Sequence, residues 1–385
     1  MIKRSIEETV MKLPGDFPVI AITGPSQSGK TTLAKKVFPN KPYALLDDPE
    51  TSRFATSDPM GFLSQFPEGA IIDEIQKAPQ LFSYLQGTID SRGTAGMFVL
   101  VGSQNFMLTE NVTPSLAGRV ATVKLLPFSL EELATVDMFY ERYEDCLFNG
   151  MFPKLYISDI AATDFYADYV SLYIGRDLLQ MKKVHDLSSF HTFLKMCALR
   201  TGQLVNLSSI ADDCGISHNT AGAWISLLEA SSIIFLLRPH HKNFNKRLVK
   251  VPKMYFTDTG LAAYLAGVLN AEHLANHPLK GPLFENFIIC ELLKERLNAG
   301  REPNLYFWRD KLGHEIDCLI DNEGELFPME IKSGRTVSED YFKNILYWNK
   351  LSGGKSENAT VVYGGAEDQK RNSTNVLSWN NLNSF

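Results

Sequence analysis

The sequence predicts a multidomain α/β protein. Up to about residue 133, short apolar strands alternate with helical patterns, which is typical of a parallel sheet with helices on its faces. A glycine-rich loop stands between the first strand and the first helix of this region. The chain has 385 residues, of which 44% are apolar, so it is long enough and apolar enough to bury several cores.

The first region is expected to hold four strands. Residues 17–24, FPVIAITG, form the first apolar run, and residues 31–38, TTLAKKVF, open a helix after it. Further strands are expected at 69–74, 97–103 and 119–126, where short apolar runs are bounded by turn residues. The runs at 17–24, 69–74 and 97–103 have continuous apolar centres, which is typical of buried strands.

The pattern changes after this region. From about 134 to 205 aromatic residues and leucines recur at helical spacing, and residues 206–257 indicate two or three short helices, an apolar strand and a basic loop. Residues 258–385 mix helix and strand again. In that last part we expect helices over 281–297 and 338–351 and strands within 304–310, 314–321, 326–334 and 359–365.

Composition and charge exclude several classes of protein. Lys and Arg number 38 against 44 Asp and Glu, a net charge of −6, so the chain is not uniformly basic like a histone. The five cysteines are widely spaced with no C-x-x-C pair, which argues against a disulfide framework and favours a reducing, cytoplasmic location. The N-terminus is charged throughout, unlike a signal peptide, and no apolar run approaches the ~18 residues that span a membrane.

Residues 24–31, GPSQSGKT, fit the pattern G-x-x-x-x-G-K-[ST] between a predicted strand and a predicted helix. The glycines let backbone N–H groups curl around phosphates, and the helix N-terminus adds positive potential. Lys30 is expected to reach the β- and γ-phosphates of ATP, and the Thr31 hydroxyl to bind Mg²⁺. The residues expected to hold the nucleotide are Gly24, Pro25, Ser26, Gln27, Ser28, Gly29, Lys30, Thr31 and Thr32.

Acidic and polar residues follow two later strands. Residues 70–74, AIIDE, form an apolar strand that ends in two acids. Behind a phosphate loop, Asp73 is expected to bind Mg²⁺ with the nucleotide, and Glu74 to polarise the attacking water as the catalytic base. The next buried strand ends in Ser103, and Ser103 or Gln104 is expected to sense the γ-phosphate. The alternatives are a solvated strand end for the acids and an ordinary loop cap for Ser103.

Arg119 stands just before another strand, after the polar sensor in the order of motifs. This place in the order predicts a catalytic arginine finger, which stabilises charge on the transferring phosphoryl group. Whether Arg119 acts on its own nucleotide or on that of a neighbouring subunit stays open, and the second case implies a homo-oligomer. The alternative is an ordinary surface charge.

The order of these motifs resembles that of the AAA ATPase superfamily. Gly102-Ser103, Ser115–Arg119 and Leu126–Glu132 resemble more narrowly a bacterial and archaeal family, and Tyr173–Asp177 and Tyr255–Leu261 extend the resemblance. Members of that family pair an AAA ATPase module with a C-terminal domain of unknown function that has a restriction-endonuclease-like, PD-(D/E)xK core. The resemblance covers nearly the whole chain and implies architecture better than biology.

The resemblance and the changes in pattern together predict four domains. Residues 1–133 are expected to form a P-loop AAA-type ATPase domain, and residues 134–205 a helical lid or linker. Residues 206–257 are expected to be winged-helix-like, and residues 258–385 a small nuclease-like α/β domain.

Residues 207–237 have the pattern of a helix-turn-helix, in which Gly215 makes the turn and Trp224 closes the core. The stretch 238–253 that follows contains six basic residues and no acid, which stands out in a chain of net charge −6. We expect this stretch to contact DNA phosphates. The alternative is a helical packing or protein-binding module with a solvated loop. The basic residues are Arg238, Lys242, Lys246, Arg247, Lys250 and Lys253.

Carboxylates in the last region resemble the PD-(D/E)xK nuclease pattern. Asp317 lies on one strand and Glu330-Ile331-Lys332 on the next, where the period of a strand puts Glu330 and Lys332 on one face. Asp317 and Glu330 are expected to bind Mg²⁺, with Glu285 from the preceding helix completing the metal ligands and Lys332 acting as the catalytic lysine beside the attacking water. Ile316 replaces the usual proline. The alternative is a relic fold in which the acids pair with Lys332 and Arg309.

These features favour a cytoplasmic, Mg²⁺-dependent ATPase whose nucleotide state controls DNA engagement by its C-terminal half. One alternative is an ATP-gated, metal-dependent DNA endonuclease. A second is a nucleotide-switched protein-interaction regulator without DNA activity. The expected cofactors are ATP and Mg²⁺, and the expected partners are ATP or ADP, DNA through 238–253 and further copies of the chain, with no membrane.

Overall fold

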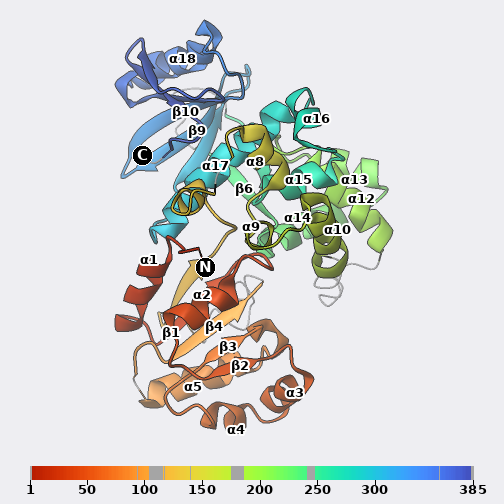
Figure 1. Ribbon diagram of the computed structural model, residues 1–385, viewed down its shortest axis with the longest axis vertical. Coiled ribbons are helices and arrows are strands. Elements are labelled where there is room, and N and C mark those ends of the chain that lie inside the picture. The colour runs from red at the N-terminus through yellow and green to blue at the C-terminus, as the bar shows by residue number, and fades with distance from the viewer. Residues whose placement is uncertain are drawn as a thin grey trace. The chain divides into compact units, whose positions relative to one another are not determined.

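The computed structural model describes residues 2–92, 94–103, 116, 118–138, 140–174, 186–240, 248–354 and 356–382 (Figure 1). The chain forms two compact units. The first unit comprises Met1–Phe128, Ala230–Ile233 and Arg296–Arg301, and the second comprises Ser129–Glu229, Ile234–Glu295 and Glu302–Phe385. Among the described residues, none of the helices combines the length and hydropathy needed to cross a lipid bilayer.

The first unit is built on a five-stranded sheet in the order β2-β3-β4-β1-β5, with every neighbouring pair parallel. The predicted α/β class of this region is therefore confirmed. Strand β2 is the one strand here that the sequence did not indicate. The strands are β1 Val19–Thr23, β2 Tyr43–Leu45, β3 Ile71–Asp73, β4 Phe98–Gly102 and β5 Val120–Lys124.

Helices cover both faces of this sheet, which explains why β1 and β4 are buried along their whole length. On one face, Ile20 and Ile22 of β1 pack in a cluster with Leu33 of α2. On the other face, Val19 and Ala21 pack in a cluster with residues of α3 to α5. The helices are α1 Glu7–Lys12, α2 Lys30–Val37, α3 Pro49–Ser57, α4 Pro59–Ser64 and α5 Leu81–Arg92.

The second unit begins with the helical middle that the sequence predicts. Asp258 fastens several of its helices, because its carboxylate accepts hydrogen bonds from Leu261 N at 2.9 Å, Tyr166 Oη at 2.6 Å and Met151 N at 2.7 Å. The helices are α7 Leu130–Ala134, α8 Tyr143–Asn149, α9 Lys154–Ile157, α10 Ala162–Asp168, α12 Leu187–Ala198, α13 Leu207–Cys214, α14 His218–Ala230, α15 Thr259–Leu265, α16 Ala271–Ala275 and α17 Lys280–Asn298.

Helices α13 and α14 are joined by the turn that the sequence predicts. Gly215 adopts a left-handed conformation with φ 64°, which ends α13 and turns the chain toward α14. The rings of Phe190 and Phe193 on α12 meet Trp224 on α14 edge to face. Strands β6 Ile234–Pro239 and β7 Lys253–Phe256 follow as an antiparallel pair.

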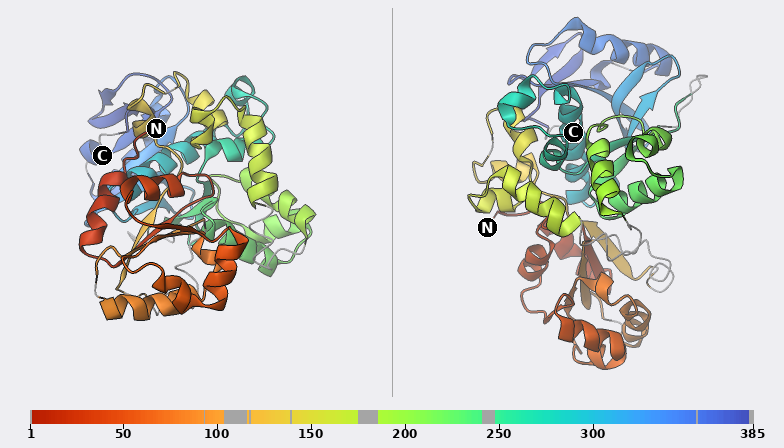
Figure 2. Two further views of the ribbon diagram at one scale, coloured as in Figure 1. Left: turned by 60° about the horizontal axis from the view of Figure 1, so that its bottom comes forward. Right: turned by 90° about the vertical axis from the view of Figure 1, so that its right-hand side faces the viewer.

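This pair is part of a larger sheet. Eight strands run in the order β12-β13-β11-β10-β9-β8-β6-β7, and β6 joins β8 through the pairs Arg238↔Tyr306 and Pro239↔Phe307. Helix α18 Lys343–Ser352 covers one face of the sheet (Figure 2, blue segments). Its Trp348 packs against Trp308 of β8. The remaining strands are β8 Leu305–Arg309, β9 Glu315–Asn322, β10 Glu325–Lys332, β11 Thr360–Tyr363, β12 Gln369–Arg371 and β13 Thr374–Ser378.

Candidate functional sites

The glycine-rich loop follows the carboxyl end of β1 and leads into α2, as predicted. Gly24 has φ 146°, and a Cβ at this position would stand 2.0 Å from Leu125 O. Gly29 is the residue before α2 and has φ 96°, a left-handed conformation that favours glycine. Both glycines of the motif are therefore required by the backbone itself.

An arginine from the N-terminal segment holds this loop. The buried guanidinium of Arg4 donates from Nη1 to Ser28 O at 2.8 Å and from Nη2 to Leu126 O at 2.6 Å. It also lies over the ring of Phe128, 4.9 Å from the centroid. Arg4 thus ties the loop to the segment that follows β5, a role that the sequence analysis missed.

The polar groups of the loop suit a phosphate ligand. The Lys30 side chain is buried, and its Nζ donates to Pro25 O at 2.8 Å. The Ser28 hydroxyl is buried and finds no hydrogen-bond partner among the residues that the structure describes. Ser26 and Gln27 are half-buried, and Thr32 is exposed on α2. A buried hydroxyl without a partner is costly, and an anionic oxygen in the loop would satisfy it.

The residues expected to bind Mg²⁺ meet at the same edge of the sheet. The Thr31 hydroxyl donates to Asp73 Oδ2 at 2.7 Å, and the Tyr43 hydroxyl donates to the same oxygen at 2.9 Å. Burial and the neighbouring Asp73 carboxylate raise the pKa of Tyr43, so the phenol stays protonated and keeps donating. Mg²⁺ prefers oxygen ligands, and the Thr31 hydroxyl and the Asp73 carboxylate offer two of them side by side.

Glu74 and Ser103 are linked by a residue that the sequence analysis did not single out. Strand β4 lies next to β3 with Asp73 paired to Val101, so Ser103 follows two residues beyond that pair at the carboxyl ends of the two strands. The Gln76 amide donates from Nε2 to Glu74 Oε2 at 2.5 Å and to Ser103 Oγ at 3.2 Å. Gln104 lies outside the described residues.

Arg119 lies at the opposite edge of the sheet from the loop. Its carbonyl oxygen accepts from Val19 N at 3.2 Å, at the amino end of β1. The five residues of β1 separate this end from the loop by about 16 Å at ~3.3 Å per residue. The guanidinium donates to Asp90 from Nε at 2.7 Å and from Nη2 at 3.2 Å. This geometry separates Arg119 from the nucleotide loop of its own subunit, and action on a neighbouring subunit stays a proposal.

The predicted C-terminal residues converge on two adjacent strands of the second unit. Asp317 Oδ2 accepts from Lys332 Nζ at 2.8 Å and from Ile331 N at 2.8 Å, and Lys332 Nζ lies 2.6 Å from Glu330 Oε2. Burial and the charge of Asp317 raise the pKa of Glu330 to about 8. The other carboxylate oxygen of Glu330, Oε1, is buried.

Glu285 joins a different set of acids from the one predicted. In the part of the chain that the structure describes, carboxylate oxygens of Glu285, Glu315 and Asp317 lie within 4.8 Å of one another. Glu315, the first residue of β9, was not predicted, although it lies two residues from Asp317 on the same strand. Glu330 is connected to these acids by Lys332, whose ammonium contacts both Glu330 and Asp317. We call Glu285, Glu315 and Asp317 the acid cluster.

A lysine of β7 lies in the acid cluster. Lys253 is only 3% exposed, and its Nζ lies 2.9 Å from Glu285 Oε1 and also contacts the Glu315 carboxylate. The Tyr255 hydroxyl donates to the same Glu285 oxygen at 2.5 Å. Burial alone would lower the pKa of Lys253, but the carboxylates of Glu285 and Glu315 raise it above its usual range, so the ammonium stays charged.

The position of Lys253 corrects the prediction for the basic stretch 238–253. Lys253 was expected to contact DNA phosphates, but it is buried against carboxylates and offers no charge at the surface. Arg238 and Lys250 are exposed. The other three basic residues, Lys242, Lys246 and Arg247, lie outside the described residues.

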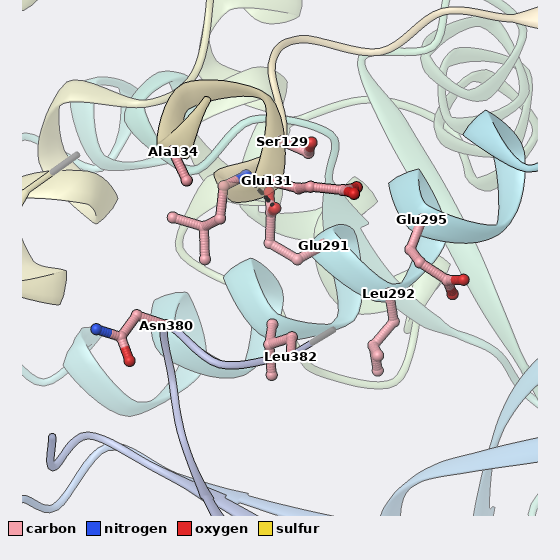
Figure 3. Close-up of a pocket in the computed structure, with 9 residues that line it drawn as sticks. Ser129, Glu131, Ala134, Glu291, Leu292, Glu295, Asn380 and Leu382 are labelled. Atoms are coloured by element: carbon pink, nitrogen blue, oxygen red, sulfur yellow. Dashed lines mark hydrogen bonds between the residues drawn. The ribbon is translucent and has the colours of Figure 1, made fainter. Parts of the chain in front are cut away.

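Figure 3 shows a small acidic pocket elsewhere in the second unit. Glu291 of α17 reaches one of its walls and accepts a hydrogen bond from Leu130 N at 2.7 Å, and it also pairs with Lys294 Nζ at 2.6 Å. The carboxylate therefore satisfies a backbone N–H in the first turn of α7. This contact gives Glu291 a structural role.

Family models match three segments of the chain. Residues 16–134 match an AAA domain, residues 140–272 a domain of unknown function, DUF8612, and residues 280–382 a second domain of unknown function, DUF4143. The predicted pairing of a P-loop AAA-type domain with a C-terminal domain of unknown function is confirmed. The restriction-endonuclease-like core stays a proposal.

Two mycobacterial proteins are similar to the chain. An uncharacterized protein of Mycobacterium tuberculosis is 29% identical over 326 residues, which cover 83% of this chain and 71% of that protein. An uncharacterized protein of Mycobacterium bovis matches to the same extent.

Solved structures of similar proteins are more distant. A Walker-type ATPase of Pyrococcus abyssi is 14% identical, with a TM-score of 0.46 over 69% of this chain and 96% of that one. DnaA of Aquifex aeolicus bound to AMPPCP is 14% identical, with a TM-score of 0.28 over 58% of this chain and 85% of that one. Likeness at this level carries no functional argument, which rests on the sites themselves.

Proposed function

We propose that the chain is a Mg²⁺-dependent ATP hydrolase whose nucleotide state controls DNA engagement by its C-terminal half. The contact between the Thr31 hydroxyl and Asp73 Oδ2 at 2.7 Å carries this proposal. It brings a phosphate-loop hydroxyl and a strand-end carboxylate together beside a loop whose two motif glycines both have positive φ. This combination suits a nucleoside triphosphate with its metal ion.

Each residue of the site has a role in this proposal. The loop N–H groups and Lys30 bind the phosphates, and Thr31 and Asp73 hold the metal. Bound Mg²⁺ supplies positive charge against the phosphate oxygens. Glu74 orients and deprotonates the attacking water, and Gln76 fixes the Glu74 carboxylate relative to Ser103.

Steady-state hydrolysis tests the first half of the proposal. Lys30→Ala is expected to lose nucleotide binding, because the loop then lacks its one long cation for the phosphates. Asp73→Asn is expected to keep the fold and to require more Mg²⁺ for the same rate. Wild-type protein that hydrolyses no ATP at any Mg²⁺ concentration contradicts the proposal.

The exposed face of α14 supports DNA engagement. The residues that it presents to solvent are small or neutral and polar, which lets a helix enter a major groove: they are His218, Asn219, Ala223 and Ser226. Arg238 on β6 and Lys250 before β7 add exposed positive charge on segments that follow this helix in the chain. Because a three-helix segment is followed by an antiparallel strand pair with exposed basic residues, we interpret helices α12 to α14 and strands β6 and β7 as a winged helix.

Fluorescence anisotropy with a labelled DNA duplex tests the second half. The double variant R238E/K250E is expected to weaken binding for every sequence and to reduce the salt dependence of the affinity. The matched control K350E/K370E reverses two exposed lysines of α18 and β12 and is expected to bind like wild type. Absence of DNA binding at low salt, with and without ATP, favours the protein-interaction regulator, with exposed Asp212 and Asp213 in its surface.

A second candidate function is ATP-gated, metal-dependent DNA cleavage. The convergence of Asp317, Glu330 and Lys332 favours it. The residues fit a divalent ion only in part, because the Lys253 ammonium already lies against two carboxylates of the acid cluster. Plasmid nicking with Mg²⁺ or Mn²⁺ that is lost in Asp317→Ala would support this function. A wild-type protein that nicks no plasmid contradicts it.

A further inference from the structure

The acid cluster gathers more negative charge than a largely buried site tolerates without a cation. Three carboxylates bring oxygens within 4.8 Å of one another, on α17 and β9. Close like charges in a poorly solvated site are strongly unfavourable unless a cation lies between or beside them. The stable site therefore includes a cation, which is either an ammonium group of the protein or a metal ion.

We propose that the acid cluster is a cation site whose resident cation is the Lys253 ammonium, and that Lys253 and a divalent metal ion exclude each other there. The ammonium contacts Glu285 and Glu315 directly, which are two of the three carboxylates of the cluster. The third, Asp317, is held by Lys332 at 2.8 Å. Glu315 also pairs with Arg309 Nη1 at 3.2 Å, so each carboxylate has a cation of the protein itself.

The fold places Lys253 there firmly. Lys253 is the first residue of β7, pairs with Leu237 of β6 and also bridges Leu204. Two residues later on β7, the Tyr255 hydroxyl binds the same Glu285 oxygen. A metal ion that replaced the ammonium would need the Lys253 side chain to turn away and would leave a charged lysine in a buried site.

The inference bears on the second candidate function, since it concerns the same residues, but it does not depend on any nuclease activity. It also does not depend on ATP hydrolysis. The wild-type acid cluster is closed to divalent ions as long as Lys253 stays in place.

Binding of Mn²⁺ to the full chain without nucleotide tests the proposal, with electron paramagnetic resonance counting the bound ions. All proteins carry Asp73→Asn, so that the nucleotide site contributes little. This background protein is expected to show no Mn²⁺ binding at the acid cluster. Adding Lys253→Met is expected to create a site at least tenfold tighter than any in the background, and adding Asp317→Asn to that variant is expected to abolish it.

A buried lysine on α17 provides the matched control. Lys294 is 3% exposed at its side chain and pairs with the Glu291 carboxylate. Lys294→Met also removes a buried ammonium from a carboxylate, but outside the acid cluster, and is expected to gain no Mn²⁺ site. Lys253→Arg keeps a cation in the cluster and is likewise expected to gain none.

If Lys253→Met does not fold, as judged by thermal melting, the double variant Lys253→Met/Glu315→Gln removes one charge of each sign and is used in its place. Its remaining pair, Glu285 and Asp317, is expected to bind Mn²⁺ more tightly than the background. Mn²⁺ binding to the background protein that Asp317→Asn abolishes overturns the proposal and leaves the metal site of the second candidate function standing. Failure of every foldable Lys253→Met variant to gain Mn²⁺ also overturns it.

Discussion

Replacing Arg4 is expected to loosen the nucleotide loop while every residue of the loop itself stays unchanged. Arg4→Ala removes two hydrogen bonds from a charged donor and leaves Ser28 O and Leu126 O without that partner. Such bonds contribute about 1.5–3 kcal/mol each, and coupling between them reduces the sum, so the free energy of unfolding should fall by about 2–5 kcal/mol.

Part of this lost free energy is expected to weaken the binding of ATP. The Ser28 carbonyl belongs to the loop whose backbone faces the phosphates, so an unanchored loop must be ordered again when ATP binds. If about 1.4 kcal/mol of the anchoring is felt there, the dissociation constant of ATP rises about tenfold. The dissociation constant of ATP for Arg4→Lys should lie between those of wild type and Arg4→Ala, because a single ammonium does not bridge two carbonyl oxygens as a guanidinium does.

The assay is titration with a fluorescent ATP analogue, at a temperature where thermal melting shows every variant to be folded. Lys3→Ala is the control, since Lys3 is exposed and pairs with Glu8 on the surface, and it should bind like wild type. A folded Arg4→Ala that binds the analogue as tightly as wild type would refute the argument that the guanidinium organises the loop.

Three further predictions follow from the sites. Glu74→Gln should bind ATP but hydrolyse it roughly 100-fold more slowly or worse in single-turnover assays, and unchanged turnover would mean that another group activates the water. If Arg119 acts on a neighbouring subunit, Arg119→Ala and Glu74→Gln should each be nearly inactive alone and recover part of the activity when mixed; no recovery, in a sample shown to be oligomeric, speaks against this role. Because burial and Asp317 raise the pKa of Glu330 to about 8 from 4.5, the folded protein binds a proton there that the unfolded chain releases, so this contribution to stability is present at pH 4 and is lost as the pH rises to 8. Glu330→Gln should accordingly gain stability relative to wild type between pH 5 and pH 8 in urea unfolding, and a constant difference across this range would show that Glu330 titrates normally.

The central strands β1 and β4 of the first unit were predictable because both are buried along their whole length. Strands β1 and β4 are continuous apolar runs, and the ranges expected for them contain the observed ones. Strand β2 was missed because its three residues alternate in burial and have too little apolar length. Strand β13 was missed because its buried positions include the polar Thr374 and Ser378, and β12 was missed because its three residues are all polar.

The candidate sites were predictable where a local spacing carries the chemistry, and not where partners are distant in the chain. The loop at 24–31 and the pair Asp73-Glu74 follow from spacing alone. Arg4 contacts Leu126, which lies 122 positions away in the chain, and no local sequence pattern predicts such a contact. Lys253 was grouped with the basic residues before it, although the apolar Met254 and Phe256 beside it in β7 are the signal of a buried strand.

Because β6 pairs with β8, β6 must wait during synthesis until its partner strand has been made. Strand β6 ends at Pro239 and β8 begins at Leu305, so roughly 65 residues are made between them. At about 5–20 residues per second, β6 waits roughly 3–13 s with one edge open to other chains. During that interval Lys253 also lacks Glu315, which comes later still. A stall in translation between these strands should therefore promote aggregation of the nascent protein, whereas a stall after β9 should not.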